Sequence, residues 1–234
     1  MRLKKRQLPC CAPLPNISFD IDIMREWVAS HQNDYVDVYS ANPGIHKVHN
    51  SEFVKELYDN QNFEEIPLMG MAEEDMQVAE SFDESSLGET KLQRIRAKRD
   101  QVDGLPAVAN EYKWDVPNDL WKGSYFEEAF YRQFNAPVCR ARIHRLTVGK
   151  TIVPHIDYDP SYAVRIIVPI QGTDGVTNAF WPNNVREDYN LKADGSAYFL
   201  NTGFKHAVYH EGTEDRIAFV FSLKSQEDIY CLKL

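Results

Sequence analysis

The C-terminal half of the chain consists of short hydrophobic runs separated by glycine-containing turns such as Gly172-Thr173-Asp174-Gly175. Runs of this length, several of them alternating with polar residues, are typical of β-strands. Many short strands at regular spacing predict a barrel or jelly roll. The expected strands are Val138 to Val148, Thr151 to Asp157, Tyr162 to Ile170, Val176 to Trp181, Ala197 to Asn201, Ala207 to Tyr209 and Arg216 to Leu223. We therefore expect a mainly β protein with the cupin-like double-stranded β-helix fold.

The N-terminal half carries apolar residues at helical spacing, with residues that favour helix caps in front of them. We expect these helices to pack on one sheet of the barrel. The expected elements are helices from Ser18 or Asp20 to about Ser30, from Asn50 or Ser51 through Tyr58 and from Ser124 to Phe134, and strands at Tyr35 to Tyr39 and Glu111 to Asp115.

Composition divides the chain into three ranges. Residues 1–16 are basic, contain prolines and lack periodicity, so we expect a tail or arm. Residues 17–110 are expected to form a mostly helical extension, with a strongly charged excursion at about 64–103. That excursion is either a solvated helix with a mobile loop, or a lid or partner-binding element. Residues 111–234 are expected to form the double-stranded β-helix catalytic core.

Length, charge and cysteine content indicate which partners and which cellular location to expect. A chain of 234 residues with 43% hydrophobic content can bury a sizeable core. The net charge of −9 argues against nucleic acid as the main partner. No stretch has the length and apolar character of a membrane span, and none resembles a secretory signal, so we expect a cytoplasmic protein. The four cysteines lack framework spacing, and we expect reduced thiols.

The stretch around His155 carries the candidate chemistry. His155 and Asp157 are two residues apart and therefore share one face of a strand. His206 follows a glycine-containing turn and begins a later strand-like run. Two imidazoles and one carboxylate form a facial triad, which leaves one side of Fe(II) open for ligands. A His-x-Asp pair also arises by chance, and a single histidine is often an ordinary surface or core residue, so the argument depends on the combination.

Arg216 lies ten residues after His206 and begins an apolar run that is expected to be a buried strand. A buried guanidinium needs an anion, and its planar fork matches a carboxylate. A dicarboxylate cosubstrate would meet this need. The alternative is an ion pair at the strand edge with Glu214 or Asp215. Arg165 has a similar alternative, an exposed cross-strand pair.

The strand from Val138 places Arg140, Arg142 and His144 on one face by its alternation. These residues either line the pocket of a carboxylate ligand or form an outward-facing charged strand. The residues alone do not choose between the two interpretations.

The segments from Arg140 to Lys150, Pro154 to Tyr158, Arg165 to Ile170 and His206 to Arg216 resemble, in order and spacing, those of the Fe(II)/2-oxoglutarate-dependent oxygenases. Within that superfamily the chain resembles the aspartyl/asparaginyl β-hydroxylase-like family. The founding members of this family have a glycine where this chain has Asp157, so the chain is more similar to the branch of the free-proline hydroxylases.

The resemblance implies roles for the residues already named. His155, Asp157 and His206 would bind iron and be the catalytic residues. Arg216 would hold the distal carboxylate of 2-oxoglutarate, and the same pocket would be lined by Arg165, His144 and Arg142.

The implied activity is a dioxygenase reaction with Fe(II) as cofactor and 2-oxoglutarate as cosubstrate. It would consume O2, hydroxylate an amino acid, an amino-acid residue of a peptide or a related small molecule, and release succinate and CO2. Two alternatives belong to other classes: a cupin-type metalloenzyme that does not use 2-oxoglutarate, and a catalytically inactive β-helix that only binds a ligand.

Overall fold

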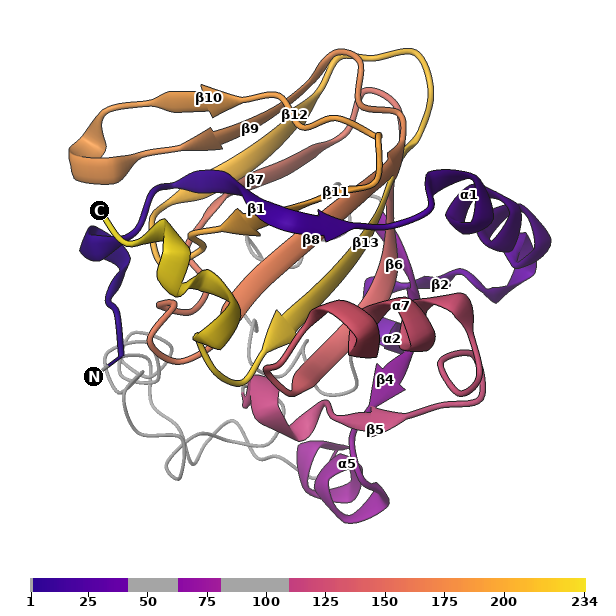
Figure 1. Ribbon diagram of the computed structural model, residues 1–234. Helices are drawn as coiled ribbons and strands as arrows, with labels where there is room; N and C mark the ends of the chain where they lie inside the picture. Colours follow the sequence, from indigo (N-terminus) through magenta and orange to yellow (C-terminus); the bar gives the residue numbers. More distant parts are fainter. Residues whose placement is uncertain (1, 42–62, 81–109) are drawn as a thin grey trace.

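The computed structural model describes residues 2–41, 63–80 and 110–234 (Figure 1). Its described strands form a seven-stranded sheet in the order β1-β11-β8-β13-β6-β3-β2, a four-stranded sheet in the order β10-β9-β12-β7, and a two-stranded pair, β4-β5. The pairings are antiparallel. The two larger sheets pack face to face, as in a jelly roll, and the expected double-stranded β-helix is confirmed.

The bounds of the strands agree with most of the runs expected in the C-terminal half. The seven-stranded sheet contains β1 (Cys11–Ser18), β2 (Val36–Asp37), β3 (Phe63–Pro67), β6 (Val138–Leu146), β8 (Val164–Gln171), β11 (Ser196–Leu200) and β13 (Arg216–Leu223). The four-stranded sheet contains β7 (Thr151–His155), β9 (Val176–Phe180), β10 (Glu187–Tyr189) and β12 (His206–His210). The short pair is β4 (Met69–Gly70) and β5 (Val116–Pro117).

The helices are short and lie around the sheets. The α-helices described are α1 (Ile21–Ser30), α2 (Val38–Ala41), α5 (Glu73–Glu80) and α7 (Tyr125–Gln133). The 3-10 helices are η1 (Lys5–Gln7), η2 (Gln32–Asp34), η6 (Glu111–Lys113), η7 (Pro182–Asn184) and η8 (Glu227–Leu232). None of the described helices has the length and apolar character required to cross a membrane.

Helix α7 covers the outer face of the seven-stranded sheet. Its N-cap is Ser124, whose hydroxyl accepts a hydrogen bond from the backbone N–H of Glu127. Phe126 and Phe130, both fully buried, contact the outward-facing rings of β13. Their ring centroids lie 4.8 Å from Phe219 and 5.4 Å from Phe221, respectively. This aromatic layer uses one set of alternate β13 residues and leaves the other set to face the barrel interior.

The barrel interior is apolar at two places where the sheets meet. Ala218 and Val220 of β13 pack in one cluster with Phe180 of β9. Leu146 of β6 packs in a second cluster with Val208 of β12. Arg216 and Ser222 fall on the same face of β13 as Ala218, because successive side chains of a strand alternate. The polar residues of the interior therefore lie on strands that are held by apolar packing on both sides.

The N-terminal residues differ from the expected tail or arm. The segment contributes strand β1, which pairs with β11 at the edge of the large sheet, and Leu3, Leu8 and Leu14 are buried. Pro13 is compatible with this position, because an edge strand has one side on which no N–H is needed. The amide of Asn201 donates to three backbone carbonyls of this segment, those of Lys5, Leu8 and Pro9. These contacts make the segment part of the folded structure.

Three further expectations need correction. The strand expected at Tyr35 to Tyr39 is only β2, followed by α2. The strand expected at Glu111 to Asp115 is the 3-10 helix η6, capped by Asn110, whose side-chain oxygen accepts from the backbone N–H of Tyr112. The beginning of the charged excursion is strand β3, where Ile66 is fully buried. Composition was misleading there, because the charged residues of β3 pair with arginines of β6.

Two expectations lie partly or wholly outside the described residues. They are the helix expected from Asn50 or Ser51, and the part of the excursion from residue 81 to 103. The division into an extension and a core near residue 110 stays a prediction. Strands β1, β2 and β3 from the N-terminal range nevertheless share one sheet with β6, β8, β11 and β13.

Candidate functional site

The structure brings the three predicted metal ligands together at one end of the small sheet. His155 ends β7, His206 begins β12, and the two are directly paired across the strands. Asp157 lies two residues beyond β7. One ligand atom of each residue lies within 4.8 Å of those of the other two. The Nε2 atoms of His155 and His206 are 3.6 Å and 3.9 Å from the carboxylate oxygens of Asp157.

Each histidine of this cluster is oriented by its own backbone. The Nδ1 atom of His155 lies 2.7 Å from the carbonyl oxygen of Val153, and that of His206 lies 3.0 Å from the carbonyl oxygen of Phe204. A carbonyl oxygen only accepts, so each Nδ1 carries a proton and donates it. The Nε2 lone pairs then remain available to a metal, the arrangement commonly found for histidine ligands.

The electrostatic environment favours the protonation states that a metal site requires. Burial and the neighbouring His155 lower the pKa of His206 to about 4. Burial raises the pKa of Asp157, but the charges of His155, His206 and Arg165 together hold it below its usual range. At neutral pH His206 is therefore a neutral imidazole and Asp157 a carboxylate. These are the forms in which both side chains bind metals.

Arg216 is buried on the interior face of β13, with only 4% of its surface exposed. Among the described residues it has no ion-pair or hydrogen-bond partner. Burial lowers its pKa to about 10, so the guanidinium stays charged at neutral pH. An unpaired charge in this position is strongly destabilising unless an anion binds it.

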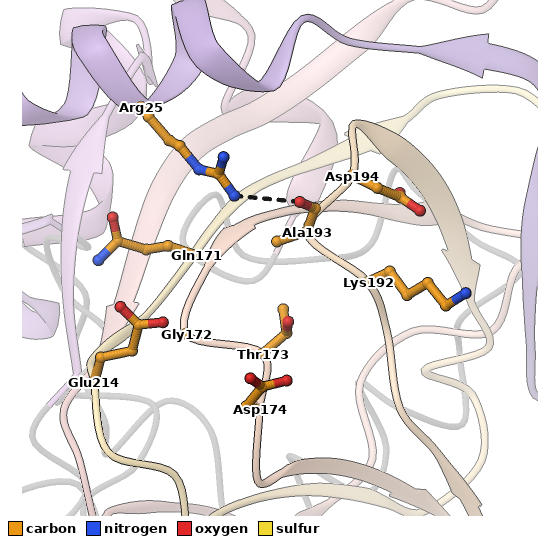
Figure 2. Close-up of a pocket in the computed structure, with 9 residues that line it drawn as sticks. All are labelled: Arg25, Gln171, Gly172, Thr173, Asp174, Lys192, Ala193, Asp194 and Glu214. Carbon is orange, nitrogen blue, oxygen red and sulfur yellow. Dashed lines mark hydrogen bonds between the residues drawn. The ribbon is translucent and has the colours of Figure 1, made fainter.

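The ion pair considered for Arg216 at the strand edge is absent from the described structure. Asp215 instead accepts a hydrogen bond at 3.0 Å from the backbone N–H of Val148. Glu214 lines a separate pocket of about 440 Å³ on the outside of the barrel (Figure 2). The pocket in Figure 2 has side chains of both signs, and Arg25 in it donates to the carbonyl oxygen of Ala193 at 3.3 Å. None of the predicted site residues is among those that line it.

Arg165 of β8 is buried between two carboxylates. Its Nη2 atom is 2.8 Å from Glu111 Oε1 and 3.9 Å from Asp157 Oδ2. Its Nη1 atom is buried and has no hydrogen-bond partner among the described residues. The exposed cross-strand pair considered for Arg165 is therefore wrong.

His144 of β6 adds a second buried polar atom that has no partner in the described part of the chain. Its ring is buried and stacks on Phe63 at 4.8 Å between centroids, and the atom without a hydrogen-bond partner among those residues is Nδ1. Burial lowers its pKa to about 3, so the ring is neutral. The neighbouring strands β8, β13 and β6 thus present Arg165, Arg216 and His144 to the interior. The outward-facing charged strand, the second of the two interpretations of β6, is therefore wrong, and a role of these residues in lining a ligand pocket stays a prediction.

Arg142 differs from these three because its guanidinium is already engaged. Its Nε atom is 2.7 Å from Glu65 Oε1, and its Nη1 atom donates to the carbonyl oxygen of Arg140 at 3.0 Å. Arg140 in turn is paired with Glu111 at 2.8 Å. The predicted role of Arg142 in cofactor binding stays a prediction, and the contacts described give it a structural one.

Glu65 and Glu111 are the residues of this region that sequence reasoning missed. Both are buried, with 3% and 1% of their surfaces exposed, and both pair with interior arginines. Glu65 and Ile66 are neighbours in β3 and therefore point to opposite faces of the sheet. This alternation was a weak sign that Glu65 faces the interior, and the charged composition around it suggested a solvated surface. Glu111 offers no local signal, because only the tertiary fold brings η6 next to β6, β8 and β13.

The interior is positively charged although the whole chain is acidic. The guanidinium groups of Arg140, Arg142, Arg165 and Arg216 outnumber the carboxylates of Glu65, Glu111 and Asp157. A divalent metal at the triad would increase the excess. The region is therefore suited to an anionic ligand beside a metal ion.

Comparison with known proteins shows remote similarities only. No protein-family model matches the chain, and no curated protein matches it. Among solved structures, a prolyl-4-hydroxylase of Pseudomonas putida is similar at 11% identity, with 92% of each chain covered and a TM-score of 0.41. A 2OG-Fe(II) oxygenase family oxidoreductase of Burkholderia pseudomallei is similar at 16% identity, covering 88% of this chain and 91% of that one, with a TM-score of 0.38. A cupin domain of Bordetella pertussis matches 40% of this chain and 88% of its own at 16% identity, with a TM-score of 0.31.

Proposed function

We propose that this protein is an Fe(II)- and 2-oxoglutarate-dependent dioxygenase that hydroxylates an amino acid, an amino-acid residue or a related small molecule. Succinate and CO2 would be the products from the cosubstrate. The observation that carries the proposal is the combination of a His-Asp-His cluster with a buried arginine, Arg216, that has no partner among the described residues. A metal alone would leave Arg216 unexplained.

The ligand set fits Fe(II). His155, Asp157 and His206 would hold the ion, since they offer two neutral imidazoles and one carboxylate within one small cluster. Bound Fe(II) would supply the open coordination positions and the redox chemistry needed to activate O2 with 2-oxoglutarate. The protein residues keep the ligands in their binding forms through the backbone contacts at Val153 and Phe204.

The interior fits a dicarboxylate. Arg216 would bind the distal carboxylate through a charge-assisted pair. On the adjacent strands lie Arg165 Nη1 and His144 Nδ1, two buried atoms without a partner among the described residues. The side chains of His155 and Asp157 are 33% and 35% exposed, whereas Arg216 is buried. We expect the metal to lie at the solvent-accessible end of the site, where a substrate can approach, and the distal carboxylate at its buried cationic end.

The experiment that tests the proposal is anaerobic binding of Fe(II) and 2-oxoglutarate, followed by an O2-dependent succinate assay over a panel of free amino acids and peptides. The proposal predicts binding of both ligands and succinate formation that increases with the correct substrate. A cupin-type metalloenzyme would bind the metal without consuming 2-oxoglutarate. An inactive binding module would bind ligand and form no succinate under any condition.

A further inference from the structure

The guanidinium of Arg165 lies between a carboxylate that serves no metal and one that is a proposed metal ligand. Its Nη2 atom is 2.8 Å from Glu111 Oε1 and 3.9 Å from Asp157 Oδ2. A movement of about 1 Å would bring the same nitrogen within hydrogen-bonding distance of Asp157. An arginine that pairs closely with a carboxylate occupies the oxygen lone pairs that a metal ion also needs. Arg165 is thus a potential competitor of the metal.

Glu111 is held firmly in the position from which it binds Arg165. Its Oε1 atom also accepts from the Ser222 hydroxyl at 2.7 Å, and its Oε2 atom accepts from Arg140 Nη1 at 2.8 Å. The preceding residue, Asn110, accepts a hydrogen bond from the Tyr162 hydroxyl at 2.7 Å and fixes the start of η6. Both carboxylate oxygens of Glu111 are therefore occupied by donors from three different strands.

The carboxylate of Glu111 also stays ionised at neutral pH. Burial raises its pKa, but the charges of Arg165, Arg140 and Arg142 and the hydrogen bond from Ser222 lower it to about 2. The group is therefore ionised throughout the physiological range, and its pairing with Arg165 does not depend on pH there.

We propose that Glu111 is a positioning residue that holds the guanidinium of Arg165 away from Asp157 and so keeps the Asp157 carboxylate available to the metal. The inference rests on the proposed metal site. Glu111 would affect metal binding through the position of Arg165. If the charge of Glu111 is removed, the nearest described carboxylate to that nitrogen is Asp157, and the two are expected to pair.

The test is calorimetric titration of the protein with Co(II), a redox-stable substitute for Fe(II), without 2-oxoglutarate or O2. The d–d absorption of Co(II) is recorded in parallel, because it reports the number and type of ligands. Glu111→Gln keeps the size of the side chain and removes its charge. Changes in residues that orient metal ligands typically weaken metal affinity about 10- to 100-fold, and we expect a loss in this range.

Two further variants separate the proposed role from a general structural one. Glu65→Gln removes a buried carboxylate from another interior arginine, Arg142, which it contacts at 2.7 Å. This matched control is expected to leave the Co(II) dissociation constant unchanged, although it also destabilises the fold. The double variant Glu111→Gln/Arg165→Met removes the competitor as well. Its Co(II) affinity is expected to return to that of the wild type.

The outcomes are distinguishable. If Glu111→Gln binds Co(II) as tightly as the wild type, or if the double variant is as weak as Glu111→Gln alone, the inference is overturned. If Glu111→Gln does not fold, the double variant is compared directly with the wild type. Weaker Co(II) binding by the double variant would then also overturn the inference. Failure of the wild type to bind Co(II) would instead contradict the proposed metal site itself.

Discussion

Replacement of Arg216 by methionine is predicted to have opposite effects on cosubstrate binding and on stability. Methionine is unbranched and flexible, so it keeps the apolar stem of the arginine in the interior and carries no charge. Arg216 has no hydrogen-bond or ion-pair partner among the described residues, so Arg216→Met leaves no described polar group without its partner. The polar interactions lost would be those with the proposed cosubstrate.

The magnitude of both effects follows from the burial of Arg216. A charge-assisted carboxylate contact contributes about 1.5 to 3 kcal/mol, so 2-oxoglutarate is expected to bind about 10- to 150-fold more weakly. Burial lowers the Arg216 pKa from its usual value to about 10, which corresponds to a cost of about 3 kcal/mol for keeping the charge in the ligand-free interior. Because the lowered pKa disfavours the charged form, this cost applies in full at neutral pH, below both values. Arg216→Met is therefore expected to raise the free energy of unfolding of the ligand-free protein.

The assay measures 2-oxoglutarate affinity by anaerobic calorimetry with Fe(II) present, and stability by urea denaturation of the metal-free, ligand-free protein. Arg142→Met is the matched control, because Arg142 is also buried but is paired with Glu65 at 2.7 Å. Arg142→Met leaves the Glu65 carboxylate buried without this partner and is expected to destabilise the protein by about 3 to 5 kcal/mol. Unchanged 2-oxoglutarate affinity in Arg216→Met, or a loss of stability like that of the control, would refute the reasoning.

Three other predictions follow from the site and its supports. His155→Ala, Asp157→Ala and His206→Ala are each expected to abolish Fe(II) binding and turnover while the far-UV circular dichroism stays unchanged, and full turnover in any one would remove that residue from the triad. His144 has a pKa lowered to about 3 from 6.5, so the ligand-free protein is expected to lose stability as pH falls through this window, by at most about 1.4 kcal/mol per pH unit from this group. His144→Phe should reduce the slope in pH-dependent urea denaturation, and an unaltered slope would show that His144 is not the cause. Asn201→Ala is expected to lower the free energy of unfolding by about 1 to 3 kcal/mol in urea denaturation, because the Asn201 amide donates to the N-terminal segment. An unchanged free energy of unfolding would show that these hydrogen bonds do not stabilise the fold.

The sequence was sufficient to predict that His155, Asp157 and His206 lie together, because its signals are local. His155 and Asp157 are two residues apart at the end of a strand, and His206 follows a turn that allows β12 to pair with β7. Register on a sheet then determines which side chains meet. The burial of Arg216 was predictable for the same reason, because this residue begins a continuous apolar run that forms β13.

The sequence was not sufficient where contacts depend on tertiary structure. Glu111 interacts with residues of three strands from outside the barrel, and Glu65 is hidden in a range whose charge suggested a solvated surface. The prolines and basic residues of residues 1–16 suggested a tail. The edge of a sheet tolerates prolines, however, and the Asn201 amide donates to carbonyl groups of that segment. Composition does not reveal such partners, because they are distant in the sequence.

The most direct test of the proposed function is the stoichiometry of 2-oxoglutarate consumption. Purified protein is supplied with Fe(II), 2-oxoglutarate, O2 and the substrate panel, and succinate is measured together with the remaining 2-oxoglutarate. The account predicts equal amounts of succinate formed and 2-oxoglutarate consumed, dependent on Fe(II) and O2 and absent in Asp157→Ala. Fe(II) binding without succinate formation by the wild type, across the whole panel, would contradict it.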